Sequence, residues 1–174
     1  MGFYFQVCRT EPYMENYITF VLEHYRELNL PYAFSVSLSF LASPALTEGS
    51  AFLCFNEDDE IVGAFGYIRG TAEHQYEDTH VGQIQIAYLD ERYRRSRLFA
   101  ESLQYLVQHN ANQLHPVQTF KFWVPSKLEL HRLFSKLASR EASWETAQGT
   151  IDEFHGQFAD WQAYTERYRR HVYF

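Results

Sequence analysis

The chain has 174 residues, of which 46% are hydrophobic and 18% aromatic, so it can bury a substantial core and is not intrinsically disordered. Its formal net charge of −7 argues against broad binding to nucleic acids or anionic membranes, because both depend on basic surfaces. We find no repeat and no Pro- or Gly-rich linker, so residues 1–174 are expected to form a single domain.

The chain begins without a basic segment followed by an apolar run, and no apolar stretch reaches the length of a membrane span. We therefore expect a cytoplasmic protein. Cys8 and Cys54 lie in predicted strands with apolar residues close by, which favours buried free thiols over a disulfide or a metal pair.

The first third of the chain predicts a strand, two helices and a hairpin. Aromatic and β-branched residues predict a strand over Phe3–Val7. Apolar residues at helical spacing predict a helix over Pro12–Leu30, and a less regular pattern predicts another over Pro31–Leu46. Two apolar runs, Ala51–Phe55 and Ile61–Ile68, flank a short acidic turn and predict a β-hairpin.

The middle of the chain predicts a loop, a strand and a helix. Thr71–His80 is polar and is expected to be a loop, and Val81–Leu89 alternates as a strand does. A basic turn, Arg92–Arg97, leads into a helix with an apolar stripe formed by Phe99, Leu103, Leu106 and Val107.

The last third predicts a strand over Val117–Val124 and a helix opened by a capping box of Ser126 and Glu129. Two more strands are expected within Trp144–Phe158, followed by a short helix with an aromatic stripe formed by Trp161, Tyr164 and Tyr168. The order β-α-α-β-β-β-α-β-α-β-β with a C-terminal helix predicts an α/β fold with a mixed sheet.

The most specific segment runs from Ala87 to Phe99 and reads A-Y-L-D-E-R-Y-R-R-S-R-L-F, a strand, an arginine-rich turn and a helix. Together with the element order over Phe3–Phe158, it resembles the GNAT superfamily of N-acetyltransferases. The resemblance implies acetyl-CoA as co-substrate, with its pantetheine arm paired to the strand and its pyrophosphate held by the turn. The implied contacts are Ala87, Tyr88 and Leu89 on the strand, and Arg94, Arg95, Ser96, Arg97, Leu98 and Phe99 in the turn.

The turn favours anions on physical grounds as well. A helix N-terminus presents unpaired N–H groups and a partial positive charge. Arg92, Arg94, Arg95 and Arg97 add guanidinium groups, which suit phosphate geometry. The alternative is a solvated basic turn or a surface for an acidic partner.

The sequence departs from the family pattern at several positions. Arg95, Arg97 and Phe99 occupy positions where the family has small residues, so their side chains would crowd the amides or contact phosphate themselves. Phe134 stands where the family has the Tyr that protonates the departing thiolate. Lys127 is a further candidate for contact with a phosphate.

Candidates for the general base lie just before the central strand, where the resemblance places one. They are Glu73 and Glu77, with Asp78 beside them, and Gln83 and Gln85 could position a water. Carboxylates in a polar loop are, alternatively, simply solvent-facing.

No metal is expected, because His74 and His80 fit no standard ligand spacing. Tyr32 and Phe34 either line the acceptor pocket or pack in the core. The aromatic stripe of the last helix either closes the core or forms a homodimer contact.

Two functions follow as hypotheses. The first is an acetyl-CoA-dependent N-acetyltransferase acting on an amine of a small molecule or a peptide. The alternative is a catalytically degenerate module of the same fold that binds CoA, another phosphate ligand or a protein partner. Neither nucleic acid nor membrane is an expected partner, since one basic turn is too small a surface.

Overall fold

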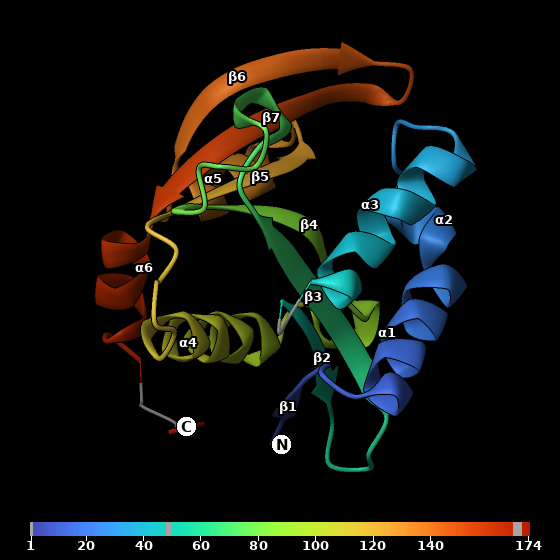
Figure 1. Ribbon diagram of the computed structural model, residues 1–174, viewed down its shortest axis with the longest axis vertical. Helices are drawn as coiled ribbons and strands as arrows, with labels where there is room; N and C mark the ends of the chain where they lie inside the picture. Colours follow the sequence, from blue (N-terminus) through green and yellow to red (C-terminus); the bar gives the residue numbers. More distant parts are fainter. Residues whose placement is uncertain (1, 48–49, 169–171) are drawn as a thin grey trace. The chain divides into compact units, whose positions relative to one another are not determined.

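The computed structural model describes residues 2–47, 50–168 and 172–174 (Figure 1). In chain order the elements are β1 (Tyr4–Val7), α1 (Glu11–Glu23), α2 (Tyr25–Leu28), α3 (Phe34–Leu46), β2 (Ala51–Phe55), β3 (Ile61–Arg69), β4 (Val81–Leu89), α4 (Leu98–Ala111), β5 (Thr119–Pro125), α5 (Leu128–Phe134), β6 (Ser139–Thr146), β7 (Gly149–Gln157) and α6 (Phe158–Thr165). The strands are hydrogen-bonded in the order β1-β2-β3-β4-β5-β7-β6. The mixed α/β fold expected from the sequence is confirmed.

By its internal contacts the chain divides into two units. The first comprises Met1–Ile68 and Gln85–Ser102, and the second comprises Arg69–Ile84 and Leu103–Phe174. Both β4 and α4 contribute residues to each unit. The expectation of one domain stays a prediction, and the two units are described separately below.

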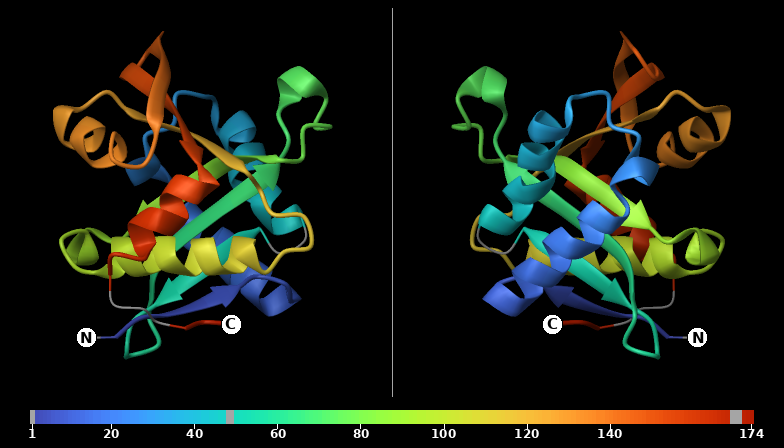
Figure 2. Two further views of the ribbon diagram at one scale, coloured as in Figure 1. Left: turned by 90° about the vertical axis from the view of Figure 1, so that its left-hand side faces the viewer. Right: turned by 90° about the vertical axis from the view of Figure 1, so that its right-hand side faces the viewer.

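In the first unit, β1, β2 and β3 form antiparallel pairs, and alternate residues of β2 face a core shared with α1 and α3. Figures 1 and 2 show α1 and α3 running along one side of these strands. Tyr17 of α1 is fully buried and donates a hydrogen bond to the carbonyl of Leu41 in α3, at 3.0 Å. On the other face, the thiol of Cys54 lies 3.7 Å from the hydroxyl of Ser102 in α4.

The helix predicted over Pro12–Leu30 is interrupted at His24. There the backbone leaves helical geometry (ψ 11°), so that α1 ends at Glu23 and α2 begins at Tyr25. Asn29, in the left-handed region at φ 48°, ends α2. The apolar spacing continues through this break, which is why the sequence pattern did not reveal it.

In the second unit, β7 pairs with both β5 and β6, and aromatic residues form the core on one face. Trp161 of α6 stacks on Phe120 with ring centroids 4.8 Å apart, and its indole N–H donates to the carbonyl of Leu137 at 2.8 Å. Phe122 stacks on Phe154 at 5.6 Å. α6 therefore covers this aromatic face, as one of the two interpretations of its stripe requires.

Three boundary predictions in this unit are wrong. Lys127 rather than Ser126 is the N-cap residue of α5, and it makes no side-chain capping hydrogen bond. The backbone amide of Ser126 donates instead to the carbonyl of Thr150 in β7, at 2.8 Å. β6 begins at Ser139 rather than near Trp144, and Tyr168 lies beyond the end of α6.

Cys8 and Cys54 are buried free thiols, as predicted. Burial raises the pKa of each thiol to about 12. Both side chains belong to the first unit and are inert at neutral pH, because the thiolate is the reactive form.

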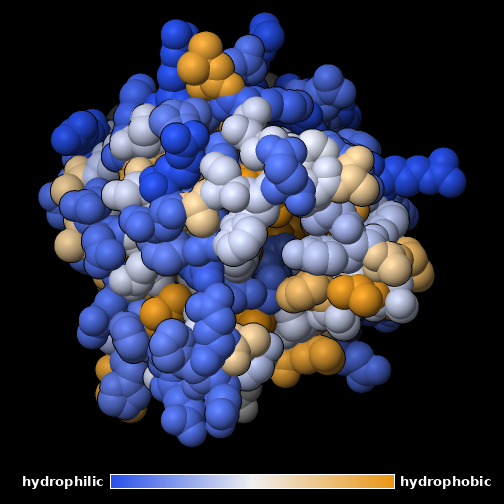
Figure 3. All heavy atoms as spheres, turned by 90° about the horizontal axis from the view of Figure 1, so that it is seen from above, coloured by the Kyte–Doolittle hydropathy of each residue, from blue (hydrophilic) through white to orange (hydrophobic). Residues whose placement is uncertain are grey.

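The surface seen in Figure 3 is mostly hydrophilic, with hydrophobic residues scattered between polar ones. Within residues 2–47, 50–168 and 172–174, no helix combines the length and apolar character that crossing a bilayer requires.

Candidate cofactor and active site

β4 is the predicted cofactor strand, and among the described strands part of its backbone edge has no partner. Its parallel ladder with β5 pairs only Val81–Gln83 with Thr119–Lys121. Among the strands that the structure describes, none continues this pairing along Gln85–Leu89. Ala87 in this stretch is exposed. An unpaired strand edge can hydrogen-bond an extended ligand, which is what the prediction for Ala87, Tyr88 and Leu89 requires.

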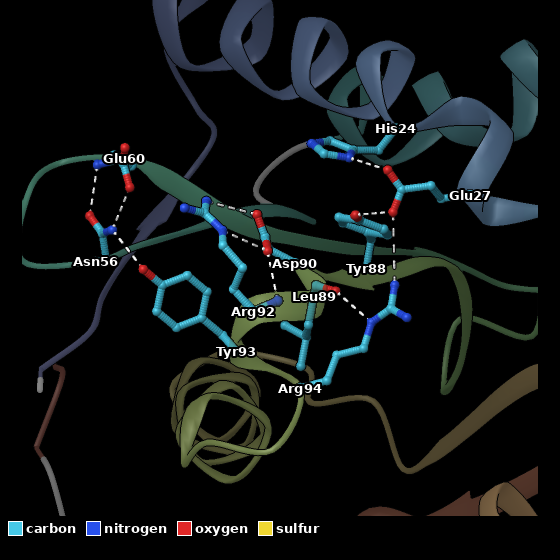
Figure 4. A network of polar contacts seen from close by, with 10 residues as sticks. All are labelled: His24, Glu27, Asn56, Glu60, Tyr88, Leu89, Asp90, Arg92, Tyr93 and Arg94. Atoms are coloured by element: carbon cyan, nitrogen blue, oxygen red, sulfur yellow. Dashed lines mark hydrogen bonds and ion pairs between the residues drawn. The ribbon is translucent and has the colours of Figure 1, made fainter.

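The turn after β4 is built around Asp90. Its carboxylate accepts hydrogen bonds from the amide of Arg92 at 2.9 Å and from the guanidinium of Arg92 at 2.9 and 3.1 Å (Figure 4). Its own amide donates to the carbonyl of Val62 in β3 at 2.8 Å. The hydrogen bonds from Arg92 hold the pKa of Asp90 below its ordinary value. The turn is thus fixed to the sheet by side-chain and backbone bonds.

Tyr93 anchors the same turn to the β2–β3 hairpin. Its phenol oxygen accepts a hydrogen bond from the Asn56 amide at 3.0 Å, and its ring meets that of Phe3 edge-on at 5.6 Å. Asn56 is itself held by the backbone amides of Asp58 and Glu60. This ordinary packing role explains Tyr93 without a ligand.

Ser96 caps the start of α4. Its hydroxyl donates to the carbonyl of Tyr93 at 2.6 Å and accepts from the amide of Leu98 at 3.1 Å. One of the backbone donors expected to hold a pyrophosphate is therefore already bonded. An anion at this helix terminus would replace Ser96 at that amide or bind elsewhere in the turn.

The arginines of the turn remain accessible. Arg94 and Arg97 keep 51% and 68% of their side-chain surface exposed, and Arg95 is exposed as well. The guanidinium of Arg97 lies 3.8 Å from the carboxylate of Glu101, one helical turn further on. Exposed guanidinium groups with such weak partners can exchange them for phosphate oxygens.

His24, Glu27, Tyr88 and Arg94 form a polar group that we call the Glu27 cluster (Figure 4). Tyr88 donates its phenol proton to Glu27 Oε2 at 2.5 Å, and His24 Nδ1 lies 2.9 Å from Glu27 Oε1. Arg94 Nη2 lies 4.0 Å from Glu27 Oε2, while its Nε donates to the carbonyl of Leu89 at 3.0 Å. The cluster therefore connects α2, β4 and the turn.

The cluster fixes the charge of Glu27 and Tyr88. The hydrogen bond from Tyr88, followed by that from His24, holds the pKa of Glu27 below its ordinary value. Burial, followed by the hydrogen bond to Glu27, raises the pKa of Tyr88. At neutral pH Glu27 is thus an anion and Tyr88 a neutral donor.

Glu27→Gln is expected to change the pH dependence of stability. Because its folded-state pKa is lowered, ionised Glu27 stabilises the fold above its ordinary pKa of 4.5, and this contribution is lost as the pH falls through the folded value. Wild type should therefore melt higher than Glu27→Gln at pH 7, and the gap should close at acid pH. Melting temperatures measured between pH 7 and pH 3 test this, with Glu15→Gln on α1 as the control. A difference in melting temperature between wild type and Glu27→Gln that stayed constant over this range would contradict the prediction.

The predicted general bases belong to the second unit. Glu73 is largely exposed and lies 3.6 Å from Lys121 Nζ, and Glu77 is exposed. Asp78 accepts hydrogen bonds from the amide and the hydroxyl of Thr71, at 2.7 and 2.8 Å, and thereby shapes its own loop. The assignment of Glu73 or Glu77 as base stays a prediction.

The second unit also holds a polar cluster on β5 and β7. Glu153 Oε1 lies 2.7 Å from His155 Nε2 and 3.4 Å from Lys121 Nζ, and the indole N–H of Trp123 donates to Glu153 Oε2 at 3.2 Å. Burial opposes ionisation of Glu153, but His155 and Lys121 outweigh it and lower its pKa. These neighbours account for the buried charge of Glu153.

Other predicted positions divide between the two units. Lys127 is exposed at the start of α5, and Phe134 packs against Phe122 with ring centroids 5.0 Å apart. Tyr32 and Phe34, in the first unit, are 52% and 55% exposed, so the interpretation that both pack in the core is wrong. Within the described part of the chain, no group of three His, Cys, Asp or Glu residues could hold a metal ion.

Sequence reasoning missed His24 and Glu27. Their spacing of three residues within a predicted helix was the one signal available, and it is common on solvated helix faces. Their partner Tyr88 lies 61 residues beyond Glu27, and nothing in the local pattern connects the two.

Solved structures share this fold. A GNAT-family acetyltransferase from Staphylococcus aureus covers 90% of this chain and 99% of its own, with a TM-score of 0.63 and 16% identity. Ard1 from Thermoplasma volcanium covers 90% of this chain and 98% of its own, with a TM-score of 0.66 and 12% identity. The chain has the GNAT fold. A spermidine N-acetyltransferase chimera from Vibrio cholerae shares it too, with a TM-score of 0.64 at 7% identity over 93% of this chain and 99% of its own.

No protein-family model matches the chain, and a search of curated proteins finds no significant relative. The similarity to GNAT structures thus lies in the three-dimensional arrangement. It establishes the fold, and the activity has to be argued from the site.

Proposed function

We propose that this GNAT-fold protein is an N-acetyltransferase that transfers an acetyl group from acetyl-CoA to an amine of a small molecule or a peptide. The observation that carries the proposal is the unpaired edge of β4, which leads directly into an arginine-rich turn and the start of α4. An extended arm that ends in phosphates matches this succession of backbone donors and guanidinium groups.

The residues present fit such a co-substrate. The backbone of Ala87 to Leu89 would pair with the pantetheine arm, and the exposed guanidinium groups of Arg94 and Arg97 would contact the phosphates. Arg95 stands where the family has a small residue, and because it is exposed, it could contact phosphate through its side chain. The role of Lys127, which belongs to the second unit, stays a prediction from the sequence.

The chemistry required of the protein is modest. The thioester supplies an activated acyl group, and the protein orients the amine, takes up its proton and limits access of water. Direct transfer needs no covalent intermediate on the protein. Phe134 offers no proton for the departing thiolate, so the proton would come from another donor or from water.

The second candidate function is that of a binding module without catalysis. Two observations favour it: Phe134 lies within an aromatic cluster and has no hydroxyl group, and Ser96 already occupies the amide of Leu98. Such a module would bind CoA, another phosphate ligand or a protein partner through the same turn.

Calorimetric titration with acetyl-CoA and with CoA, followed by an assay of thiol release with a panel of primary amines, distinguishes the two functions. Micromolar binding together with amine-dependent thiol release supports the transferase. Binding without release for any amine favours the module. If neither acetyl-CoA nor CoA bound, the cofactor assignment itself would be contradicted.

A further inference from the structure

His24, at the break between α1 and α2, packs between two aromatic rings and contacts a carboxylate. Its ring packs against Phe20 and Tyr88, with centroids 4.5 and 4.6 Å away, and Nδ1 lies 2.9 Å from Glu27 Oε1. Nε2 has no hydrogen-bond partner within the described residues. The side chain is 23% exposed, so the ring is oriented by packing and is still reachable.

The pair formed by Glu27 and His24 has the properties of an oriented base. Since Glu27 is ionised at neutral pH, its hydrogen bond places the imidazole proton on Nδ1 and leaves the lone pair on Nε2. The second oxygen of Glu27 is occupied by Tyr88, which prevents the carboxylate from turning away. A carboxylate fixed in this way also stabilises the imidazolium that forms when Nε2 takes a proton.

The position of this pair matters as much as its chemistry. Tyr88 belongs to the stretch of β4 whose backbone the proposed function assigns to the acyl donor. The ring of His24 stacks on Tyr88 within the same unit, so the pair and this stretch of β4 are held in contact.

We propose that His24 is the general base of the transferase and that Glu27 positions it. This inference rests on the proposed function. It differs from the base predicted from the sequence, which was placed at Glu73 or Glu77 in the second unit.

In the proposed step, the acceptor amine gives one proton to His24 Nε2 as its nitrogen forms a bond to the acyl carbon. The carbon–sulfur bond then breaks, and the electron pair leaves with sulfur. The thiolate takes the proton back from the imidazolium, directly or through water, so the products are the amide and a free thiol, and His24 is regenerated.

Four titratable or charged groups surround His24. Glu27 and Tyr88 contact its ring directly, Asp90 interacts with it electrostatically, and Arg94 is paired with Glu27. Since only neutral imidazole accepts a proton, kcat/KM should fall as the pH is lowered, and the group responsible should be His24.

The test uses His24→Gln, whose amide can still hydrogen-bond to Glu27 but cannot accept a proton. General bases contribute on the order of 100- to 10,000-fold, so kcat should fall at least about 100-fold with CoA affinity unchanged, and the acid limb of the kcat/KM profile should disappear. His115→Gln, the same change at an exposed histidine in the second unit, is the matched control and should keep wild-type kcat.

A second measurement does not depend on turnover. Nitrogen-15 chemical shifts of the His24 ring should show the proton on Nδ1 in the wild type, and Glu27→Gln should lose this preference. Mixed tautomers in the wild type, or a His24→Gln variant with wild-type kcat and pH profile, would overturn the inference while leaving the transferase in place. A wild-type protein that binds CoA but acetylates no amine would instead overturn the proposed function, and the base role with it.

Discussion

Alanine at both Arg94 and Arg97 is expected to weaken CoA binding by about 100-fold. A hydrogen bond to a charged group contributes roughly 1.5–3 kcal/mol, and about 1.4 kcal/mol corresponds to a factor of ten in affinity. The lower end applies here, because each guanidinium must first leave a partner: Glu27 and the Leu89 carbonyl for Arg94, and Glu101 for Arg97. Two such losses multiply to about 100-fold.

The control for this pair is Arg9→Ala, which removes the same charge from an exposed position between β1 and α1. Calorimetry at one fixed ionic strength should show unchanged affinity for the control, since a distant exposed charge is largely screened. Unchanged affinity in the double variant would mean that the pyrophosphate does not lie at this turn.

Trp161→Ala is expected to lower the free energy of unfolding by about 3–5 kcal/mol, the usual cost of truncating a buried Trp. The Trp161 side chain is almost fully buried, stacks on Phe120 and donates its indole proton to the carbonyl of Leu137. Its removal leaves a cavity in the second unit and a carbonyl without this donor, and both effects act in the same direction.

Trp144→Ala provides the matched control, because Trp144 on β6 is 53% exposed. Urea unfolding should place its midpoint close to that of wild type, since exposed substitutions usually change stability by less than about 0.5 kcal/mol. Similar midpoints for the two Trp variants would show that the packing of α6 on β5 contributes little.

The elements around the candidate site were the most predictable part of the fold. β4 was predicted over Val81–Leu89, the range that the structure shows, because its strict alternation is bounded by a polar loop and a basic turn. The β2–β3 hairpin was equally clear, with an acidic turn between two apolar runs. Local pattern suffices where both ends of an element carry a signal.

Features that depend on distant partners could not be predicted. Ser126 had a suitable spacing to Glu129 for a capping box, but its backbone amide donates to the carbonyl of Thr150 in β7, a strand that follows later in the chain. The break at His24 preserves the apolar spacing, so periodicity alone reports one helix. In each case a tertiary contact decides between two locally acceptable structures.

The candidate site shows the same division. The cluster of arginines was visible in the sequence, and so was its place between a strand and a helix. Their partners were not, since Arg94 meets Glu27 only through the fold. A count of the arginines in the sequence therefore overstates how many guanidinium groups are available to a ligand, because some are already paired within the fold.

The buried thiols of Cys8 and Cys54 can serve as probes of local opening in the first unit. Cys8 lies after β1 and Cys54 within β2, and both stay protonated and covered while the strands remain in place. A thiol reagent can modify them only in molecules whose strands have separated, at a rate set by the population of that open state. The rate of thiol modification therefore measures how often this part of the sheet opens, without an added label.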